Sequence, residues 1–291
     1  MSLTTNSVAT TLSDRALLVS LRIRMWTARK LDRKETAELA AKHGITEGIA
    51  RVNKSLLPNA PKLEELATAS ASLRNFYYEN TLPWAVDGSQ MLPAKRYMWF
   101  AQEARQKLEA WHRVKDAFVR EYPTYRIQAA SALNGLFKDD DYPHPDFVAE
   151  KFGADVRFFP MPDARDFRVE LADEEMQRMA HDLEITAKEA LAESTRNCWQ
   201  RLHVVVSRAV GRLSQPDAIF RDSLVENAKE LCGLLTDLNL GDDPNLEAMR
   251  REVERTLACQ APDTLRNVPS VRQEVADKMS EIERKMKAFM L

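Results

Sequence analysis

The feature that most constrains the fold is an uninterrupted helical pattern from Asp173 to Leu213. It contains no proline, and its first glycine is Gly211. Apolar residues recur in steps of three, four or seven, the spacing of a helical stripe rather than of a strand. At about 1.5 Å per residue the helix would be on the order of 60 Å long, more than a compact domain needs. We therefore expect an elongated chain or one that assembles through this helix. The stripe consists of Met176, Met179, Leu183, Ala187, Leu191, Cys198, Leu202, Val205, Ala209 and Leu213.

A second pattern, over residues 17–26, alternates apolar and polar side chains and predicts a strand with one buried face. A helix is the alternative, because Leu17, Leu21 and Met25 also fit a helical period. One face would carry Val19, Leu21, Ile23 and Met25, and the other would carry Ser20, Arg22, Arg24 and Trp26.

Residues 155–171 alternate in the same way on both sides of Pro160 and Pro162. Proline removes ladder donors and favours a turn, so this segment reads as a β-hairpin. A lone two-stranded hairpin is marginal in water. We therefore expect strand 17–26 to pair with the hairpin in a small antiparallel sheet.

The remaining segments complete a mainly α, α+β fold, an elongated helical bundle with this small sheet. Helical patterns cover residues 32–43, 46–57, 62–78, 95–121 and 125–137, while residues 81–93 read as a structured loop. The predicted division is a disordered leader at 1–14, a helical domain with the sheet at 15–214, and a C-terminal helical segment at 215–291.

Composition narrows the class of protein. Net charge is −2, so a nucleic-acid site would have to be a local patch. The N-terminal residues lack the apolar core of a signal peptide, and no run reaches the roughly eighteen apolar residues of a membrane span. Three cysteines, Cys198, Cys232 and Cys259, match no zinc spacing and suit a reducing compartment. We expect a soluble cytoplasmic protein without membrane contact.

Motifs of catalysis and of metal binding are missing from the sequence. There is no phosphate-binding GxxxxGK[ST] loop, no GxGxxG, no GxSxG and no HExxH. The acidic turn from Asp139 to Asp146 includes His144, but it lacks the alternate ligand spacing and the glycine of a calcium loop. We expect no enzyme activity, no cofactor and no bound metal.

Two groups of residues are candidates for binding. The segment 15–54 holds ten basic and four acidic residues, and cations beside an aromatic ring suit single-stranded nucleic acid. A solvated sheet face with Trp26 covered is the alternative interpretation. The candidate nucleic-acid residues are Arg22, Arg24, Trp26, Arg29 and Lys30; the candidate interface residues on the long helix are Leu191, Trp199, Leu202, His203 and Val206.

Three segments carry a resemblance to a known family: LLVSLRIRMWTARKLDRKETAE (17–38), YENTLPWAVDGSQMLPAKRYMWF (78–100) and KFGADVRFFPMPDARDFRVEL (151–171). Together they resemble an uncharacterised family of tailed-bacteriophage proteins, over roughly residues 15–215. Its members are often encoded beside a MoxR-type AAA+ ATPase and a cobaltochelatase-like von Willebrand protein. The family has no assigned catalytic residues, so none is carried over.

The resemblance implies a phage protein in the bacterial host cytoplasm, acting as an adaptor for an AAA+ ATPase. Together with the long helix, it leads us to expect a non-enzymatic interaction or assembly protein that forms a homo-oligomer or docks on that ATPase. A single-stranded nucleic-acid-binding protein is the alternative. The long helix could be buried by a second copy or by the C-terminal helices of the same chain.

Overall fold

The computed structural model describes residues 8–46, 48–84, 88–163, 173–215 and 221–289. The chain divides into two compact units. Unit 1 consists of Met1–Ser20, Tyr78–Phe100 and Arg157–Leu291, and unit 2 of Leu21–Tyr77 and Ala101–Val156. The predicted division at residues 214 and 215 does not coincide with these units, because the C-terminal helices pack with the long helix in unit 1.

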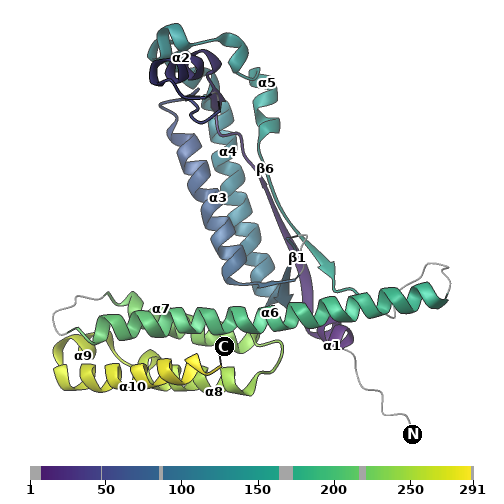
Figure 1. The fold of residues 1–291 in the computed structure, drawn as a ribbon, viewed down its shortest axis with the longest axis vertical. Coiled ribbons are helices and arrows are strands. Elements are labelled where there is room, and N and C mark those ends of the chain that lie inside the picture. The colour runs from purple at the N-terminus through teal and green to yellow at the C-terminus, as the bar shows by residue number, and fades with distance from the viewer. Residues whose placement is uncertain (1–7, 47, 85–87, 164–172, 216–220, 290–291) are drawn as a thin grey trace. The chain divides into compact units, whose positions relative to one another are not determined.

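Unit 1 is built around α6, Asp173–Leu213, a helix of 41 residues that confirms the sequence prediction. The C-terminal helices pack along one part of α6, while α6 extends beyond α1 at its other end (Figure 1). The helix is thus buried by its own chain over that part, as in the intramolecular alternative. The C-terminal elements are α7 (Ser223–Leu238), α8 (Pro244–Val253), a π-helical turn (Glu254–Ala258), α9 (Pro262–Asn267) and α10 (Pro269–Lys287). Of these, α7, α8 and α10 make the main contacts with α6.

The start of α8 shows how sequence signals position these helices. Asp243 is the N-cap, and its side chain accepts hydrogen bonds from the amides of Asn245 and Leu246. Pro244 at the first helical position has no amide to leave unpaired. The second carboxylate oxygen of Asp243 accepts a 3.0 Å hydrogen bond from Trp199 Nε1, so the same cap fixes α8 to α6.

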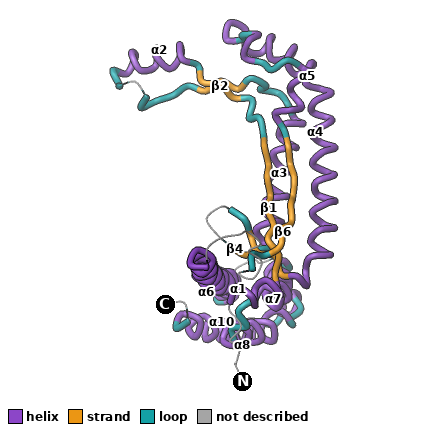
Figure 2. The backbone as a smooth tube through the Cα atoms, turned by 90° about the vertical axis from the view of Figure 1, so that its right-hand side faces the viewer, coloured by secondary structure: helices purple, strands orange, loops and turns teal. Residues whose placement is uncertain are grey.

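The four-stranded antiparallel sheet has the order β4-β5-β1-β6. Strand β1, Ala16–Arg24, pairs with β5, Gln90–Pro93, in a register that sets Leu17 opposite Leu92. Its other neighbour is β6, Gly153–Pro160, and the two run side by side in Figure 2. The strand predicted over 17–26 is therefore confirmed, as is its pairing with the first arm of the predicted hairpin. The second arm falls on residues 164–172, which lie outside the described part of the chain.

Strands β4, Leu82–Pro83, and β5 occupy the segment predicted to be a loop. Leu82, Met91 and Leu92 are fully buried there. The segment 81–93 is too short and too rich in turn residues to show alternation, so its two strands depend on the pairing of β5 with β1 and with β4.

Unit 2 packs an aromatic core between α3, Pro61–Glu79, and α4, Tyr97–Leu133. Trp111 is completely buried and donates a 2.7 Å hydrogen bond from Nε1 to Ser70 Oγ. The sequence predicted separate helices on the two sides of Pro123, but α4 continues through it. Pro123 is exposed, so water can solvate the carbonyl that it leaves without a donor, while buried Tyr122 and Tyr125 hold the helix on both sides.

Helix α2, Arg33–His43, forms as predicted, with Asp32 as N-cap and Gly44 in the left-handed conformation at its end. The helix predicted over 46–57 is wrong, because β3, Asn53–Ser55, pairs there with β2, Arg29–Leu31. The remaining elements are short: α5 (Pro145–Val148) and 3₁₀ turns at Ala94–Arg96, Asn134–Leu136, Asp139–Asp141 and Ala149–Lys151.

The predicted leader at 1–14 also requires correction. Val8–Arg15 forms helix α1, and residues 1–7 lie outside the described part. The amide of Val8 donates to Glu184 Oε1 of α6 at 3.1 Å, and Leu12 is buried in the core of unit 1. Serine and threonine made the segment look disordered, but a single buried leucine and a contact with α6 order its second half.

Candidate interaction surfaces

The basic face of unit 2 consists of exposed arginines at the end of β1 and in β2. Arg22, Arg24 and Arg29 are exposed, and none has an ion-pair partner among the described residues. Lys30 differs, because its Nζ lies 2.5 Å from Asp141 Oδ1. Three of the four predicted cations therefore remain free to meet an anionic partner.

Trp26 does not share this face, which corrects the predicted aromatic platform. Strand β1 ends at Arg24, and the backbone turns through Ala28, whose φ is +49°. Trp26 consequently packs against the core of unit 2, with its ring edge-to-face with Tyr122 at 5.9 Å between centroids. The partly buried ring serves the core, as in the alternative interpretation of this face.

A buried charge cluster explains why Lys30 is not free. Lys54 is 7% exposed and lies 2.7 Å from Asp141 and 3.8 Å from Asp32. Burial opposes ionisation of Asp141, but hydrogen bonds from Lys30 and Lys54 outweigh it, so the pKa of this carboxyl is lowered. Since Asp32 also caps α2, the cluster ties hairpin β2–β3 to α2 and to the acidic turn.

The acidic turn uses its carboxylates within the protein. Asp141 holds the two lysines, and Asp139 Oδ1 lies 2.5 Å from Arg126. Among the described residues no group of three or more His, Cys, Asp or Glu side chains is arranged to hold a metal ion. The turn therefore acts as an anchor for neighbouring cations.

The residues predicted as an interface on α6 face the interior of unit 1. Trp199, Leu202 and Val206 are between 0 and 4% exposed and belong to the core formed with the C-terminal helices. Leu191 packs near Gly241. These residues were predicted to contact another molecule. Instead, the stripe packs against helices of the same chain.

His203 is the one polar member of that predicted set. Its Nε2 lies 3.4 Å from Ser207 Oγ and 3.7 Å from Glu283 Oε1 of α10. The hydroxyl of Ser207 donates to the same Glu283. This small polar network joins α6 to α10 at the edge of the core, which is a structural role.

Residues 173–186 of α6 form a different kind of surface, which we call the acidic arm. None of its described side chains is buried, and Met179 and Ile185 are 36% and 42% exposed. The arm contains five acidic residues and one arginine, a net charge of −4. The sequence signal of the arm is its local net charge, whereas the helical period indicates only the apolar stripe. The acidic residues are Asp173, Glu174, Glu175, Asp182 and Glu184.

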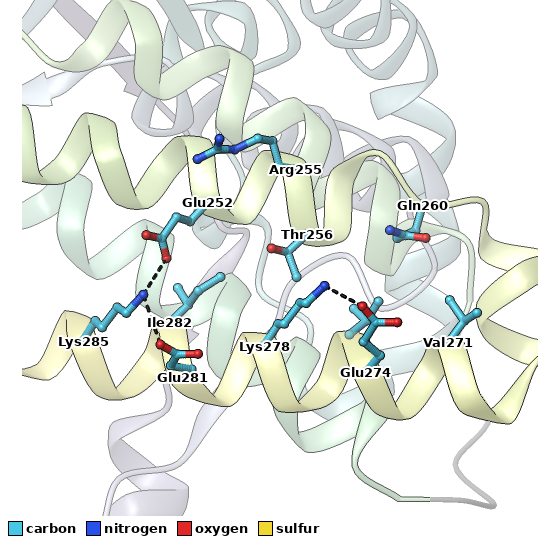
Figure 3. A pocket seen from close by; sticks show the side chains of 11 residues that line it. Glu252, Arg255, Thr256, Gln260, Val271, Glu274, Lys278, Glu281, Ile282 and Lys285 are labelled. Atoms are coloured by element: carbon cyan, nitrogen blue, oxygen red, sulfur yellow. Dashed lines mark hydrogen bonds and ion pairs between the residues drawn. The ribbon is translucent and has the colours of Figure 1, made fainter.

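A cleft of about 360 Å³ lies between α10 and the segment formed by α8 and the π-helical turn (Figure 3). Its charges other than Arg255 are paired internally: Lys285 lies 3.3 Å from both Glu252 and Glu281, and Lys278 lies 2.6 Å from Glu274. Local π-helical geometry often marks functional sites. Here the paired charges leave no net attraction for an ion, so the cleft is a weaker candidate than the arm.

Comparison with known proteins adds no second source of information. No family model, no curated protein and no solved structure matches the chain. None of the helices in the described part combines the length and apolarity that a bilayer-spanning segment requires. Function must therefore be argued from the surfaces described above.

Proposed function

We propose that this chain is a non-enzymatic interaction protein whose acidic arm binds the basic face of a second copy. The observation that carries the proposal is that none of the described side chains of residues 174–186 is buried, whereas one face of the rest of α6 packs in the core of unit 1. A rigid helix that continues past its own core presents the arm without a further loss of backbone entropy on binding. Self-association through the arm would give a phage-encoded assembly component.

Charge complementarity supports a second copy as the occupant. Glu174 and Asp182 are exposed on the arm and have no ion-pair partner in the described part of the chain. On the basic face, Arg22, Arg24 and Arg29 are likewise exposed and have no ion-pair partner among the described residues. Opposed patches of this kind steer encounter and fix orientation. Contact of arm with arm is disfavoured, because each carries a net charge of −4.

Apolar surface on the arm would supply affinity that charges alone do not. Met179 and Ile185 are exposed, and Met176 is half-buried beside them, while Leu183 packs against the core of unit 1. Burying apolar area contributes about 25 cal/mol per Å². Methionine adapts to irregular partner surfaces, so a mixed acidic and methionine-bearing helix suits docking on a basic, uneven face.

The resemblance to the phage family supplies a different occupant, an AAA+ ATPase. In that form the arm would dock on the ATPase and the chain would act as its adaptor. The acidic arm again provides the contact, and the ATPase would have to offer a basic groove. Self-association at low salt separates the two forms.

A single-stranded nucleic-acid-binding protein is the second candidate function, and the unpaired Arg22, Arg24 and Arg29 favour it. Each phosphate neutralised would release counterions, so affinity would fall steeply with salt. This candidate is the weaker of the two, because Trp26 packs in the core and Lys30 is held by Asp141. Binding of a labelled oligonucleotide that the Arg22→Glu/Arg24→Glu variant loses would support it.

The test of self-association is light scattering of the full chain in 50 mM and 500 mM sodium chloride. We expect an oligomer at low salt that dissociates at high salt, since screening weakens contacts between exposed charges. Met179→Ser should weaken the low-salt oligomer by about tenfold or less, because it removes apolar contact. Val204→Ser is the matched control: it lies on the same helix and is 58% exposed, but it is outside the arm and should change nothing.

A charge-exchange experiment identifies the two surfaces. Arg22→Glu/Arg24→Glu and Glu174→Lys/Asp182→Lys should each be monomeric, because the first presents an acidic face to an acidic arm and the second brings the net charge of the arm from −4 to 0. Mixed together, they should form a complex, since the unchanged acidic arm of the first variant meets the unchanged basic face of the second. A wild-type monomer at low salt, or a mixture that stays dissociated, would contradict the proposal. A monomer that binds a purified MoxR-type ATPase through the arm would instead favour the adaptor form.

A further inference from the structure

A second cleft, of about 440 Å³, lies in unit 1 at the end of α6 distant in sequence from the acidic arm. Helix α6 contributes Arg208 and Arg212, which are one turn apart, and Arg221 comes just before α7. None of the described lining residues carries a carboxylate, so the charge that they contribute is entirely positive. The lining residues are Val205, Arg208, Arg212, Arg221, Ser223, Leu224 and Asn227.

The three guanidinium groups are not used to hold the fold together. Arg208, Arg212 and Arg221 are exposed, and none has an ion-pair or hydrogen-bond partner through its side chain among the described residues. Two other arginines of unit 1 show the contrast. Arg266 is paired with Asp222 and Asp263, and Arg272 donates to the carbonyl oxygen of Leu213 at 3.1 Å. These two arginines hold the fold together through their side chains, whereas the three that line the cleft have no side-chain partner among the described residues.

The remaining lining residues suit an anion with polar edges. Ser223 and Asn227 are exposed one turn apart on α7 and can donate hydrogen bonds. Val205 and Leu224 supply an apolar wall. A guanidinium group binds phosphate oxygens through two parallel N–H groups, and three of them match an anion of more than one negative charge. The volume falls within the usual range of small-molecule sites.

We infer that this cleft binds a small molecule through a polyphosphate group. Arg208, Arg212 and Arg221 would hold the phosphate oxygens, and Ser223 and Asn227 would donate to its edge. A single carboxylate would leave most of the positive charge uncompensated, whereas a di- or triphosphate would neutralise it. The inference is independent of self-association, because the cleft and the acidic arm share no residue.

The experiment is isothermal titration calorimetry of the full chain with sodium tripolyphosphate at 50 mM salt, with ionic strength matched by sodium chloride in the reference. We expect saturable binding to one site. Arg208→Gln/Arg212→Gln should weaken binding at least tenfold while leaving the circular dichroism spectrum and Tm unchanged, since both side chains are exposed and unpaired. Arg196→Gln is the control: it removes a cation from the same helix, but Arg196 is already paired with Glu193 outside the cleft.

Two further titrations distinguish the source of the phosphate. Equal affinity for tripolyphosphate and ATP would place recognition in the phosphates, and tighter binding of ATP would keep the site and add a contact with the nucleoside. Glu174→Lys/Asp182→Lys should bind tripolyphosphate as the parent does, so failure of self-association would not affect this result. Absence of saturable binding, or equal binding by Arg208→Gln/Arg212→Gln and Arg196→Gln, would overturn the inference.

Discussion

The two parts of α6 have the same helical period and opposite surroundings. The acidic arm, residues 173–186, contains no described buried side chain and carries a net charge of −4. The core half, residues 187–213, carries a net charge of +3 and contributes eight buried side chains to the core of unit 1. One continuous stripe in the sequence therefore has two different roles. Periodicity identifies the face of a helix that can be buried, but it does not say what buries it.

The difference has a physical cause in the residues that flank the stripe. In the core half, Trp199, Leu202 and Val206 lie within the same face and give α7, α8 and α10 a wide apolar surface to cover. In the arm the stripe is narrow, and acidic residues adjoin it on both sides. Covering them with an apolar helix would desolvate carboxylates without a partner, which costs several kcal/mol per group. The C-terminal helices therefore pack on the core half, where burial is favourable, and leave the acidic arm uncovered.

The largest predicted effect comes from placing the same charge on each half. Leu202 is fully buried, so Leu202→Asp should lower the free energy of unfolding by about 4 kcal/mol or more. Met179→Asp, on the exposed arm, should change it by about 0.5 kcal/mol or less. Urea denaturation followed by circular dichroism measures both. Similar losses in the two variants would break the comparison, because the arm would then have to be buried.

The second prediction concerns the charge network that holds α8 over the core half. A hydrogen bond from Arg250 lowers the pKa of Glu247 from 4.5 to about 2, with Arg251 assisting and burial opposing. Because the folded-state pKa is depressed, the stabilisation is fully present above the unfolded value. It is lost as pH falls from about 4.5 towards 2. Since Glu247 is 28% exposed, solvent reduces the contribution to about 2 kcal/mol.

Glu247→Gln should therefore lose about 2 kcal/mol at pH 7 and flatten the acid limb of the stability profile. Denaturant titrations at pH 7, 5 and 3 provide the measurement. The control is Glu226→Gln on α7, which removes an exposed carboxylate without an ion-pair partner among the described residues. If the acid limb of the stability profile were the same in Glu247→Gln as in the parent, this network would not be what holds α8 over the core half.

The third prediction tests the cap that joins α8 to the core half. Asp243→Ala removes the acceptor for Asn245 and Leu246 and leaves Trp199 Nε1 without its partner. We expect a loss of about 1–2 kcal/mol in the free energy of unfolding. Asp243→Asn keeps an oxygen that can accept the cap hydrogen bonds, so it should retain most of the stability. Equal losses in the two variants would mean that the charge matters rather than the cap.

The sequence predicted those elements whose signals are local. The bounds of α6 follow from its acidic first turn, its unbroken stripe and the proline that comes soon after Leu213. Strand β1 follows from strict alternation, and α2 from Asp32 and Gly44 at its two ends. In each case the residues that specify the element lie within it.

Elements that depend on distant partners were missed. Residues 46–57 have helical spacing, but Leu56 is buried in the unit 2 core, where its carbonyl accepts from Tyr142 OH, and Lys54 is held by Asp141. In the sequence Trp26 continues the alternation of strand residues, but the backbone turns at Ala28 and the Trp26 ring packs against Tyr122. The acidic arm and the arginine-lined cleft were not predicted for another reason. Each depends on which charges remain unpaired, and pairing is a property of the folded chain.

The smallest predicted effect on stability is the most informative about the arm. Ile185 is 42% exposed, so Ile185→Ser should change the free energy of unfolding by about 0.5 kcal/mol or less. If the arm meets the basic face of a second copy, the same substitution should still weaken the low-salt oligomer, because it removes apolar area from that contact alone. Denaturation and light scattering of one preparation give both quantities. A stable variant with an unchanged oligomer would leave the arm without a role in assembly, whereas a destabilised one would place Ile185 with the core half and move the boundary between the two halves towards the N-terminus of α6.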